Sequence, residues 1–170
     1  MKVEMNGQSE HSGSRDRLAG ADSPTGSTRV SVMGVDYVHL SLADGDDLYL
    51  TPYGAPLADR LTPDGFWTDR EWSRANRQKL AGTSAVYRIR TKPVNGRAMD
   101  IVLKWNRMGQ DVPGATRADD AATAEFNSPF EEFSLATELR GAKQSTHGRI
   151  YTHRPLGIYV PARAVEWEQT

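Results

Sequence analysis

Alternation of apolar and polar residues first predicts a β-hairpin. The apolar residues Val38, Leu40 and Leu42 alternate with the polar His39 and Ser41, which is the period of a strand with one buried face. A polar turn, Ala43-Asp44-Gly45-Asp46, and a second apolar segment, Leu48-Tyr49-Leu50, follow. We therefore predict strands over residues 36–42 and 47–51, with a short loop between them.

The next periodic segment favours a helix with few apolar residues. Thr68-Asp69-Arg70-Glu71 matches the capping box, in which a Ser or Thr and a Glu three residues later bond each other's backbone N–H groups. The helix is expected to run to about Lys79, with Trp72 and Ala75 on its apolar side. Residues 30–79 are thus predicted to form an accessory hairpin and helix.

Two strands joined by a tight turn are predicted next. Strand-forming residues occupy positions 85–91 and 99–106, and Pro93-Val94-Asn95-Gly96 lies between them. Asn-Gly is among the strongest short signals for a hairpin, because both residues tolerate positive φ. The second strand contains the run Ile101-Val102-Leu103-Lys104, in which three apolar residues precede a lysine.

Signals at both ends define the main helix. Ser128-Pro129-Phe130-Glu131 combines an N-cap serine, a proline at the first helical position and a glutamate three residues after the cap. We expect the helix to run from Pro129 to about Arg140, with Gly141 as its C-terminal stop. On a helical projection its apolar residues fill one broad arc: Phe130, Phe133, Leu135, Ala136 and Leu139.

One carboxylate, Glu132, lies inside this apolar arc. A carboxylate that faces a core without a cationic partner costs on the order of several kcal/mol. Glu131 has its own function if the capping box forms, and Glu138 lies outside the arc. Lys104 is a strand-end cation without a local explanation, so we predict a Lys104–Glu132 ion pair. The alternative is that each residue is an ordinary solvated charge at the edge of its element.

The two ends of the chain give weaker patterns. Residues 1–29 are rich in Gly, Ser, Asp and Arg, and few of them could stabilise a fold, so we predict a disordered tail. Residues 107–125 resemble a loop. One or two short strands are expected within residues 149–160, around Pro155, and the start of another is expected at residues 165–167.

Composition and charge limit the classes of function. A chain of 170 residues has the size of one domain with a tail. The net charge of -1 gives no bulk attraction to nucleic acid or to an anionic membrane, and we expect neither as a partner. The absence of cysteine excludes disulfides and Cys-ligated zinc, and the four scattered histidines predict no metal site. With no signal-peptide core and no apolar run of about 20 residues, a cytoplasmic location is expected.

The order of these elements resembles the small lobe of a protein-kinase-like fold. A glycine-bearing turn opens a strand at residues 80–88, a second strand ends in Lys104, and a helix with the inward Glu132 follows. The similarity covers roughly residues 79–170. It extends to uncharacterised kinase-like proteins with a comparable helix-entry segment, residues 126–133. It implies a twisted five-stranded antiparallel sheet, one large helix and the Lys104–Glu132 ion pair.

The resemblance also implies which residues bind a nucleotide. The kinase strand motif V-A-I-K matches Ile101-Val102-Leu103-Lys104. By this match Val102 would contact the adenine of ATP, and Lys104 would reach its α- and β-phosphates. Val86 matches the valine that lies over the nucleotide base in the family. The implied cofactor is ATP with Mg²⁺, bound weakly by this chain alone.

The loop over the phosphates departs from the family pattern. Kinases use G-x-G-x-x-G-x-V, whereas this chain offers Gly82, followed by Thr83 and Ser84 as hydrogen-bond donors. Two further matches are decoys, because His153-Arg154-Pro155 lacks the catalytic aspartate and Asp64-Gly65-Phe66 precedes the lysine. Neither the catalytic base nor the Mg²⁺-binding Asp and Asn can be named in this sequence.

The resulting expectation is an α+β domain with a twisted antiparallel sheet and one main helix, extended by an N-terminal hairpin and helix. Residues 80–170 would be a kinase-like small lobe that stops before a large lobe, which the same or a separate chain would supply. Its expected function is nucleotide binding within a phosphotransferase, without catalysis alone. A pseudokinase-like module or an unrelated α+β interaction domain is the alternative. Without a large lobe, apolar residues would be exposed at Val86, Val102, Leu135, Leu139 and 165–167.

Overall fold

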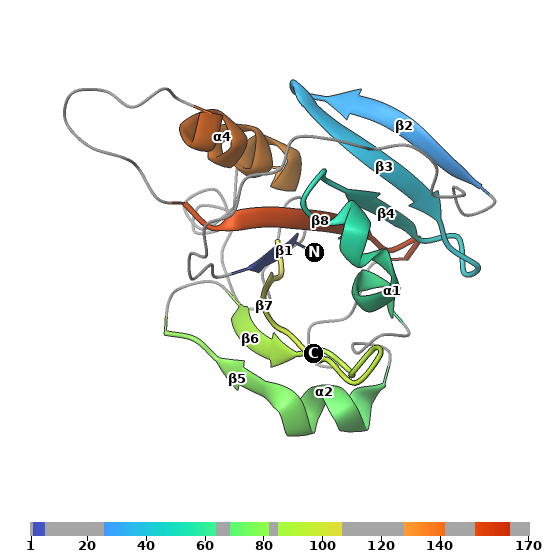
Figure 1. Cartoon of the computed structure of the whole chain (residues 1–170), viewed down its shortest axis with the longest axis vertical. Coiled ribbons are helices and arrows are strands. Elements are labelled where there is room, and N and C mark those ends of the chain that lie inside the picture. The colour runs from blue at the N-terminus through green and yellow to red at the C-terminus, as the bar shows by residue number, and fades with distance from the viewer. Residues whose placement is uncertain are drawn as a thin grey trace, which may run out of the picture.

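An antiparallel sheet with one main helix forms the framework of this α+β fold (Figure 1). The computed structural model describes residues 2–5, 26–63, 69–81, 85–106, 128–141 and 152–163. Within these residues the strands are β1 (Lys2–Met5), β2 (Ser27–Val32), β3 (Val35–Ser41), β4 (Asp47–Leu50), β5 (Arg77–Lys79), β6 (Val86–Arg90), β7 (Asp100–Lys104) and β8 (Arg154–Val160). The helices are η1 (Ala55–Leu57), α1 (Ala58–Leu61), α2 (Arg70–Asn76) and the main helix α4 (Pro129–Gly141).

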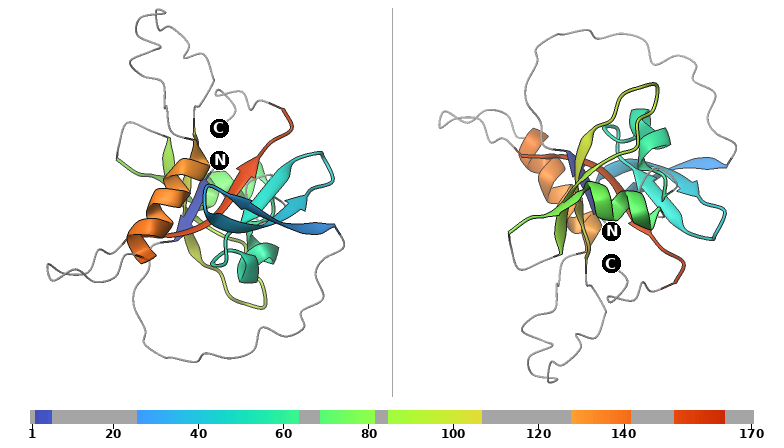
Figure 2. Two further views of the ribbon diagram at one scale, coloured as in Figure 1. Left: turned by 90° about the horizontal axis from the view of Figure 1, so that it is seen from above. Right: turned by 90° about the horizontal axis from the view of Figure 1, so that it is seen from below.

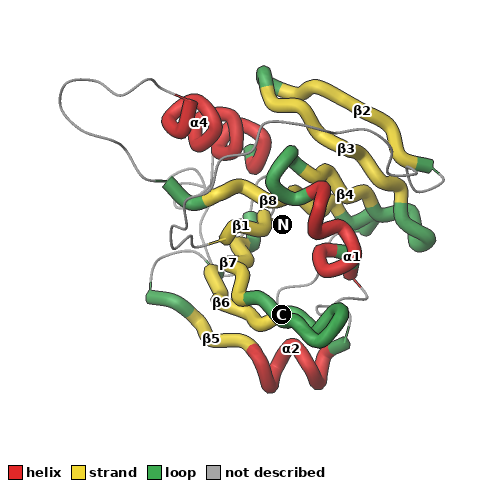
Figure 3. The backbone as a smooth tube through the Cα atoms, viewed as in Figure 1, coloured by secondary structure: helices red, strands yellow, loops and turns green. Residues whose placement is uncertain are grey.

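The sheet consists of two antiparallel blocks joined by one short strand. The strand order is β2-β3-β4-β8-β1-β7-β6-β5, so a four-stranded and a three-stranded block meet at β1. Figure 3 shows α4 next to the larger block, whereas α2 lies beside β5 and β6. The two views of Figure 2 show α4 on one side of the sheet and α2 on the other. The α+β class and the single main helix are therefore confirmed.

Both predicted hairpins form. β3 and β4 pair antiparallel, with Val38 opposite Leu50 and Leu40 opposite Leu48. β6 and β7 are likewise adjacent and antiparallel. The turn between β6 and β7 has φ values of 51° at Asn95 and 73° at Gly96, the positive values that favour Asn-Gly in a tight hairpin.

The N-terminal residues form a central strand and not a tail. β1 pairs with β7, placing Lys2 opposite Lys104, and on its other side it pairs with β8. Backbone hydrogen bonds to two neighbouring strands stabilise a segment of almost any composition, which is why composition did not predict this strand. The prediction of disorder for residues 1–29 is wrong for β1 and for the start of β2, and residues 6–25 lie outside the described part of the chain.

The polar helix α2 is shorter than predicted and begins at a different cap. Asp69, and not Thr68, is the N-cap, and its Oδ1 accepts a hydrogen bond from Trp72 N at 2.9 Å. Lys92 Nζ lies 2.8 Å from Asp69 Oδ2. Hydrogen bonds from Lys92 and from Trp72 N hold the pKa of Asp69 below its usual value. The helix ends before Lys79, because Arg77–Lys79 instead pairs with β6 as β5.

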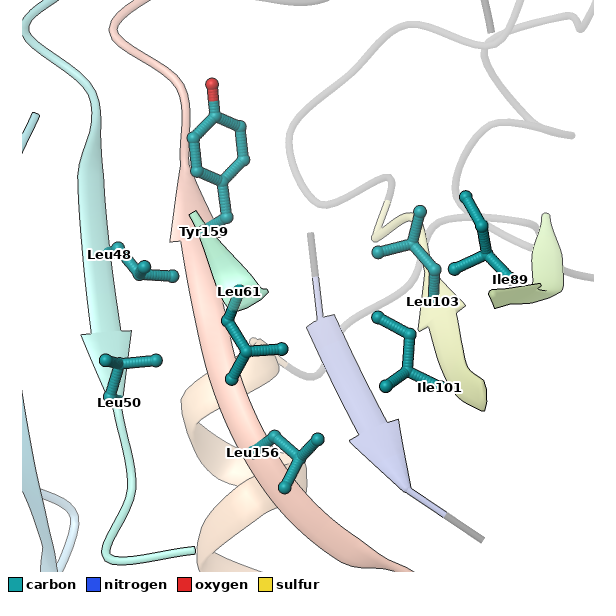
Figure 4. Packing of buried hydrophobic residues seen from close by; sticks show 8 residues of the cluster. All are labelled: Leu48, Leu50, Leu61, Ile89, Ile101, Leu103, Leu156 and Tyr159. Atoms are coloured by element: carbon teal, nitrogen blue, oxygen red, sulfur yellow. The ribbon is translucent and has the colours of Figure 1, made fainter. Parts of the chain in front are cut away.

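The larger hydrophobic core lies on the α1 side of the sheet (Figure 4). An irregularity in β8 helps to form it, because Gly157 pairs with Val3 whereas Pro155 pairs with Glu4. Leu156 is thus an extra residue, and such a bulge shifts the alternation of side chains by one position. The core side chains come from β4, α1, β6, β7 and β8: Leu48, Leu50, Leu61, Ile89, Ile101, Leu103, Leu156 and Tyr159.

A second, smaller core lies between α4 and the other face of the sheet. Phe133 is 0% exposed and packs with Tyr37 and Ile158. The rings of Tyr37, Tyr49 and Phe130 meet edge to face, with centroids 5.2 to 6.3 Å apart. Burial raises the pKa of Tyr37 to about 12. This core fixes α4 on the sheet.

The buried side of α4 is narrower than the predicted arc. Phe133 and Ala136 are buried, whereas Leu135 and Leu139 are 54% and 43% exposed. A helix on one face of a sheet buries only the stripe that faces the sheet, and Leu135 and Leu139 lie outside that stripe. Their placement in an inward arc is wrong, but their exposure agrees with the predicted exposed apolar surface.

Candidate functional site

The ion pair predicted from the sequence forms. Lys104 Nζ lies 2.7 Å from Glu132 Oε1, and the two side chains are 20% and 21% exposed. The ammonium therefore donates a charge-assisted hydrogen bond, which is shorter and stronger than a bond between neutral groups. Water and salt screen a partly buried pair less than a surface pair. The pair joins the end of β7 to the first turns of α4.

Strand pairing determines which residues share a face with Lys104. Val86 is directly opposite Lys104, and Arg88 is opposite Val102. Side chains of directly opposed residues lie on the same face of the sheet, and neighbours along a strand lie on opposite faces. Ile101 and Leu103 are buried in the larger core. Val86, Val102 and Lys104 therefore share the opposite face, on the α4 side.

The start of α4 explains why Glu132 is the carboxylate that meets Lys104. Ser128 N donates to Glu131 Oε2 at 2.6 Å, and Glu131 N donates to Ser128 Oγ at 3.2 Å. These two bonds form the predicted capping box and occupy Glu131. Glu138 is exposed on the outer side of the helix. Glu132 lies in the first turn, where the helix dipole also favours a negative charge.

Two further contacts hold α4 in position. Phe133, the neighbour of Glu132, is the centre of the smaller core. Ser134 Oγ donates to Met33 O at 2.7 Å, which ties the helix to the turn between β2 and β3. The position of Phe133 in the apolar arc was the sequence feature that predicted its packing against the sheet. No feature of the sequence predicts the Ser134 hydrogen bond, because its acceptor is a backbone carbonyl 101 residues away.

The remaining predicted nucleotide-binding residues are only partly placed. Val86 and Val102 are half-buried on the face of Lys104. Gly82, Thr83 and Ser84 fall outside the described residues. The structure thus brings together the lysine, the glutamate and the two valines, and the phosphate-covering loop stays a prediction.

The structure describes only one of the two decoy motifs. Arg154 and Pro155 belong to β8, in the middle of the sheet. Asp64-Gly65-Phe66 lies outside the described residues.

A second polar cluster crosses β2, β3 and β4. His39 Nε2 lies 2.7 Å from Asp47 Oδ1, and the Thr28 hydroxyl is 3.4 Å from His39 Nδ1. The His39 ring stacks on Tyr49 with centroids 4.6 Å apart. The described residues contain no group of three or more His, Cys, Asp or Glu that could hold a metal ion. We interpret this cluster as a cross-strand polar ladder that stabilises the sheet.

Comparisons with known proteins supply no family for this chain. No protein-family model, no curated protein and no solved structure matches it. In the part of the chain that the structure describes, no helix has the length and apolar character needed to cross a membrane. The site is therefore interpreted from its own geometry.

We expect Lys104 and Glu132 to stabilise the fold jointly. The coupling free energy in a double-mutant cycle of Lys104→Met and Glu132→Gln should be about 1–2 kcal/mol, above the value of about 0.2–1 kcal/mol for exposed pairs. Urea unfolding followed by circular dichroism measures it. Pairing Lys104→Met with Glu138→Gln is the matched control and should give no coupling. Equal coupling in both cycles would contradict the specific pair.

Proposed function

We propose that this chain is the nucleotide-binding, small-lobe portion of a protein-kinase-like phosphotransferase. The observation that carries the proposal is the 2.7 Å contact between Lys104 Nζ and Glu132 Oε1. A lysine at a strand end and a glutamate on the following helix form the pair that kinases need in place before phosphoryl transfer. Here the two residues are 28 positions apart in sequence, so only tertiary packing brings them together.

The residues around the pair fit one end of a nucleotide. Glu132 orients the Lys104 ammonium, and a bound phosphate would be held by that positive charge. Val86 and Val102 offer half-buried apolar side chains on the same face, which suits the flat face of a base. ATP with Mg²⁺ would supply the transferable phosphoryl group. The residues of this chain bind and orient it.

In this proposal the chain does not catalyse transfer alone. The catalytic base and the Mg²⁺-binding Asp and Asn of kinases belong to defined motifs, and the sequence has no match that fits them. We assign those groups to a large lobe in the same or a separate polypeptide. Closure of the two lobes would also exclude water from the phosphates.

A second candidate function is a binding module that keeps the fold for contacts with another protein. Leu135 and Leu139 favour it, because two leucines one helical turn apart are 54% and 43% exposed on α4. Exposed apolar side chains that cluster on a helix are typical of partner surfaces. A pseudokinase-like protein would use this surface without binding ATP.

Nucleotide binding by the isolated chain is expected to be weak and to depend on Lys104. One glycine replaces the three that let a backbone approach phosphates closely. Backbone amide shifts in NMR spectra, recorded during titration with millimolar Mg²⁺·ATP, should move for residues of β6, β7 and the start of α4. Lys104→Met should abolish these shifts, because it removes the positive charge.

The matched control for this titration is Glu138→Gln, which removes a carboxylate from the same helix away from the pair. It should leave the ATP-dependent shifts unchanged. No shift at millimolar ATP would favour the binding-module function instead. Micromolar affinity would contradict the expected weak binding by the isolated chain. Phosphoryl transfer by the purified chain would contradict the assignment of catalysis to a large lobe.

A further inference from the structure

Positive charge is concentrated in one segment of a chain whose net charge is close to zero. Residues 69–106 contain nine Lys and Arg residues and three Asp and Glu residues, although the whole chain has 21 and 22 respectively. The rest of the chain is therefore acidic. Residues 69–106 include α2, β5, β6 and β7, which form one end of the sheet. The molecule consequently has a basic end that its net charge conceals.

Four exposed cations of this segment lie on α2, β5 and β6, namely Arg74, Lys79, Arg88 and Arg90, whereas Arg97 lies in the turn between β6 and β7. We define the basic edge as Arg74, Arg77, Lys79, Arg88 and Arg90. β5 is the outermost strand of the three-stranded block (Figure 1). Its register places Lys79 opposite Tyr87 and Gln78 opposite Arg88, so cations occur on both faces of the edge.

Few carboxylates neutralise the basic edge. Arg88 and Arg90 share one partner, Asp100, at 2.5 and 3.8 Å, and their side chains are 57% and 60% exposed. One carboxylate between two guanidinium groups leaves an excess positive charge and orients both groups. Among the described residues, neither Arg74 nor Lys79 has a carboxylate partner.

Arg77 extends the basic edge onto the other face. Its guanidinium carbon lies 5.1 Å from the centre of the Tyr87 ring, a cation–π contact that holds the side chain without neutralising its charge.

The charged composition of the basic edge favours binding to a polyanion over binding to a protein. Protein interfaces have apolar centres from which charged residues are depleted, whereas interfaces with nucleic acid are polar and positively charged. The large hydrophobic residues that are exposed in the described part of the chain all lie outside residues 69–106: Met33, Tyr53, Leu135, Leu139 and Val160.

The spacing of the arginines also fits a phosphate backbone. Residues two apart on a strand are about 6.7 Å apart along the strand. Arg88 and Arg90 also converge on Asp100, so together they present a concentrated positive charge to a phosphate backbone. Trp72 of α2 and Tyr87 of β6 are half-buried, so the proposal rests on phosphate contacts and not on base stacking.

We propose that the basic edge binds the sugar–phosphate backbone of a nucleic acid, without base specificity. Phosphate contacts determine position and affinity but carry no direct sequence information. The proposed phosphate contacts do not include Lys104 or Glu132. Arg88 nevertheless lies opposite Val102, on the face of the proposed nucleotide site, so the two sites adjoin each other.

Fluorescence anisotropy of a labelled 20-nucleotide single-stranded DNA, titrated with the full chain, tests this proposal. If about four phosphates are contacted, affinity should fall by about 50-fold between 50 and 200 mM salt. Single-stranded RNA of the same sequence should bind within a few-fold of the DNA. Duplex DNA should show a steeper dependence, a fall of about 150-fold for four contacts, because each phosphate contact releases more counterions from a duplex.

Charge-matched variants locate the surface. Arg88→Gln combined with Arg90→Gln should weaken DNA binding by about tenfold at 50 mM salt, because two phosphate contacts are lost. Arg74→Gln combined with Lys79→Gln, which breaks no ion pair among the described residues, should also weaken binding. The control, Arg29→Gln with Arg154→Gln, removes two exposed cations from β2 and β8 and should change affinity by less than about twofold.

Three outcomes would overturn the proposal. One is no binding of the oligonucleotide at 50 mM salt. Another is equal weakening by the edge and control variants, which would indicate bulk electrostatics. The third is binding to vesicles rich in phosphatidylserine without binding to any oligonucleotide. A basic edge that only prevents strand-to-strand association would give the first outcome, with normal unfolding midpoints for all variants.

Discussion

Replacing Gly54 by alanine should lower the free energy of unfolding by about 3 kcal/mol or more. A Cβ atom at Gly54 would lie 1.9 Å from Leu156 O and 2.7 Å from Leu156 C. Both are backbone atoms of β8, so no rotation of a side chain relieves the overlap. Either the turn after β4 or the bulge in β8 has to move.

The surrounding hydrogen bonds show why that movement is costly. Thr51 Oγ1 donates to Pro155 O at 2.6 Å, and Thr51 N donates to Leu156 O at 3.0 Å. Gly54 N in turn donates to Thr51 O at 2.9 Å. Thr51 is 1% exposed, and a buried polar group left without its partner costs about 1–3 kcal/mol. Displacing the turn would break this connection between β4 and β8.

Urea unfolding followed by circular dichroism measures the effect of Gly54→Ala. Gly141→Ala is the matched control, because a Cβ atom at Gly141 would meet no atom within 4 Å beyond its own helix backbone and chain neighbours, and no positive φ is required there. The control should change stability by less than about 1 kcal/mol, in the stabilising direction that helix propensity gives. Equal midpoints for Gly54→Ala and the unaltered protein would contradict the close approach of Gly54 to Leu156.

Elements whose signals are local could be predicted from the sequence. The capping box at Ser128 and Glu131, the Asn95-Gly96 turn and the alternating β3 strand each depend on residues within a few positions of one another. Helix caps, positive φ values in turns and the alternation of side chains along a strand each act within one turn or one strand. These elements appear where the patterns placed them.

Elements that depend on distant partners could not be predicted. β1 is a strand because β7 and β8 pair with it on both sides, and those partners are about 100 and 150 residues away in the sequence. Arg77–Lys79 continues a helical pattern, yet it pairs with β6. Tertiary pairing overrides local propensity in such cases. The bulge at Leu156 likewise reflects a register that only the folded sheet defines.

The ion pair of the candidate site could be predicted because the sequence places a charged residue among apolar ones. Glu132 required a cation because of its place in an apolar arc, and Lys104 is that cation in the structure. The basic edge was not anticipated, because net charge averages over the chain and only the strand order brings those cations together. The nucleotide roles of Val86 and Val102 remain proposals that their shared face with Lys104 supports.

Replacing Phe133 by alanine should lower the free energy of unfolding by about 3–5 kcal/mol, the usual cost of removing a buried phenyl ring. Phe133 is 0% exposed and packs with Val35, Tyr37 and Ile158 between α4 and the sheet. Leu135→Ala is the control on the same helix. Because Leu135 is 54% exposed, its truncation should cost less than about 1 kcal/mol.

The functional consequence of this packing is that Phe133 positions Glu132. The variant Phe133→Leu keeps an apolar side chain and should still fold. Because leucine is smaller than phenylalanine, α4 should pack less tightly against the sheet. The coupling free energy between Lys104 and Glu132 should then fall into the range of about 0.2–1 kcal/mol that is typical of exposed pairs. The same double-mutant cycle in the Leu135→Ala background should keep its full coupling. Unchanged coupling in the Phe133→Leu background would show that the ion pair forms without the smaller core, and that a contact other than Phe133 positions Glu132.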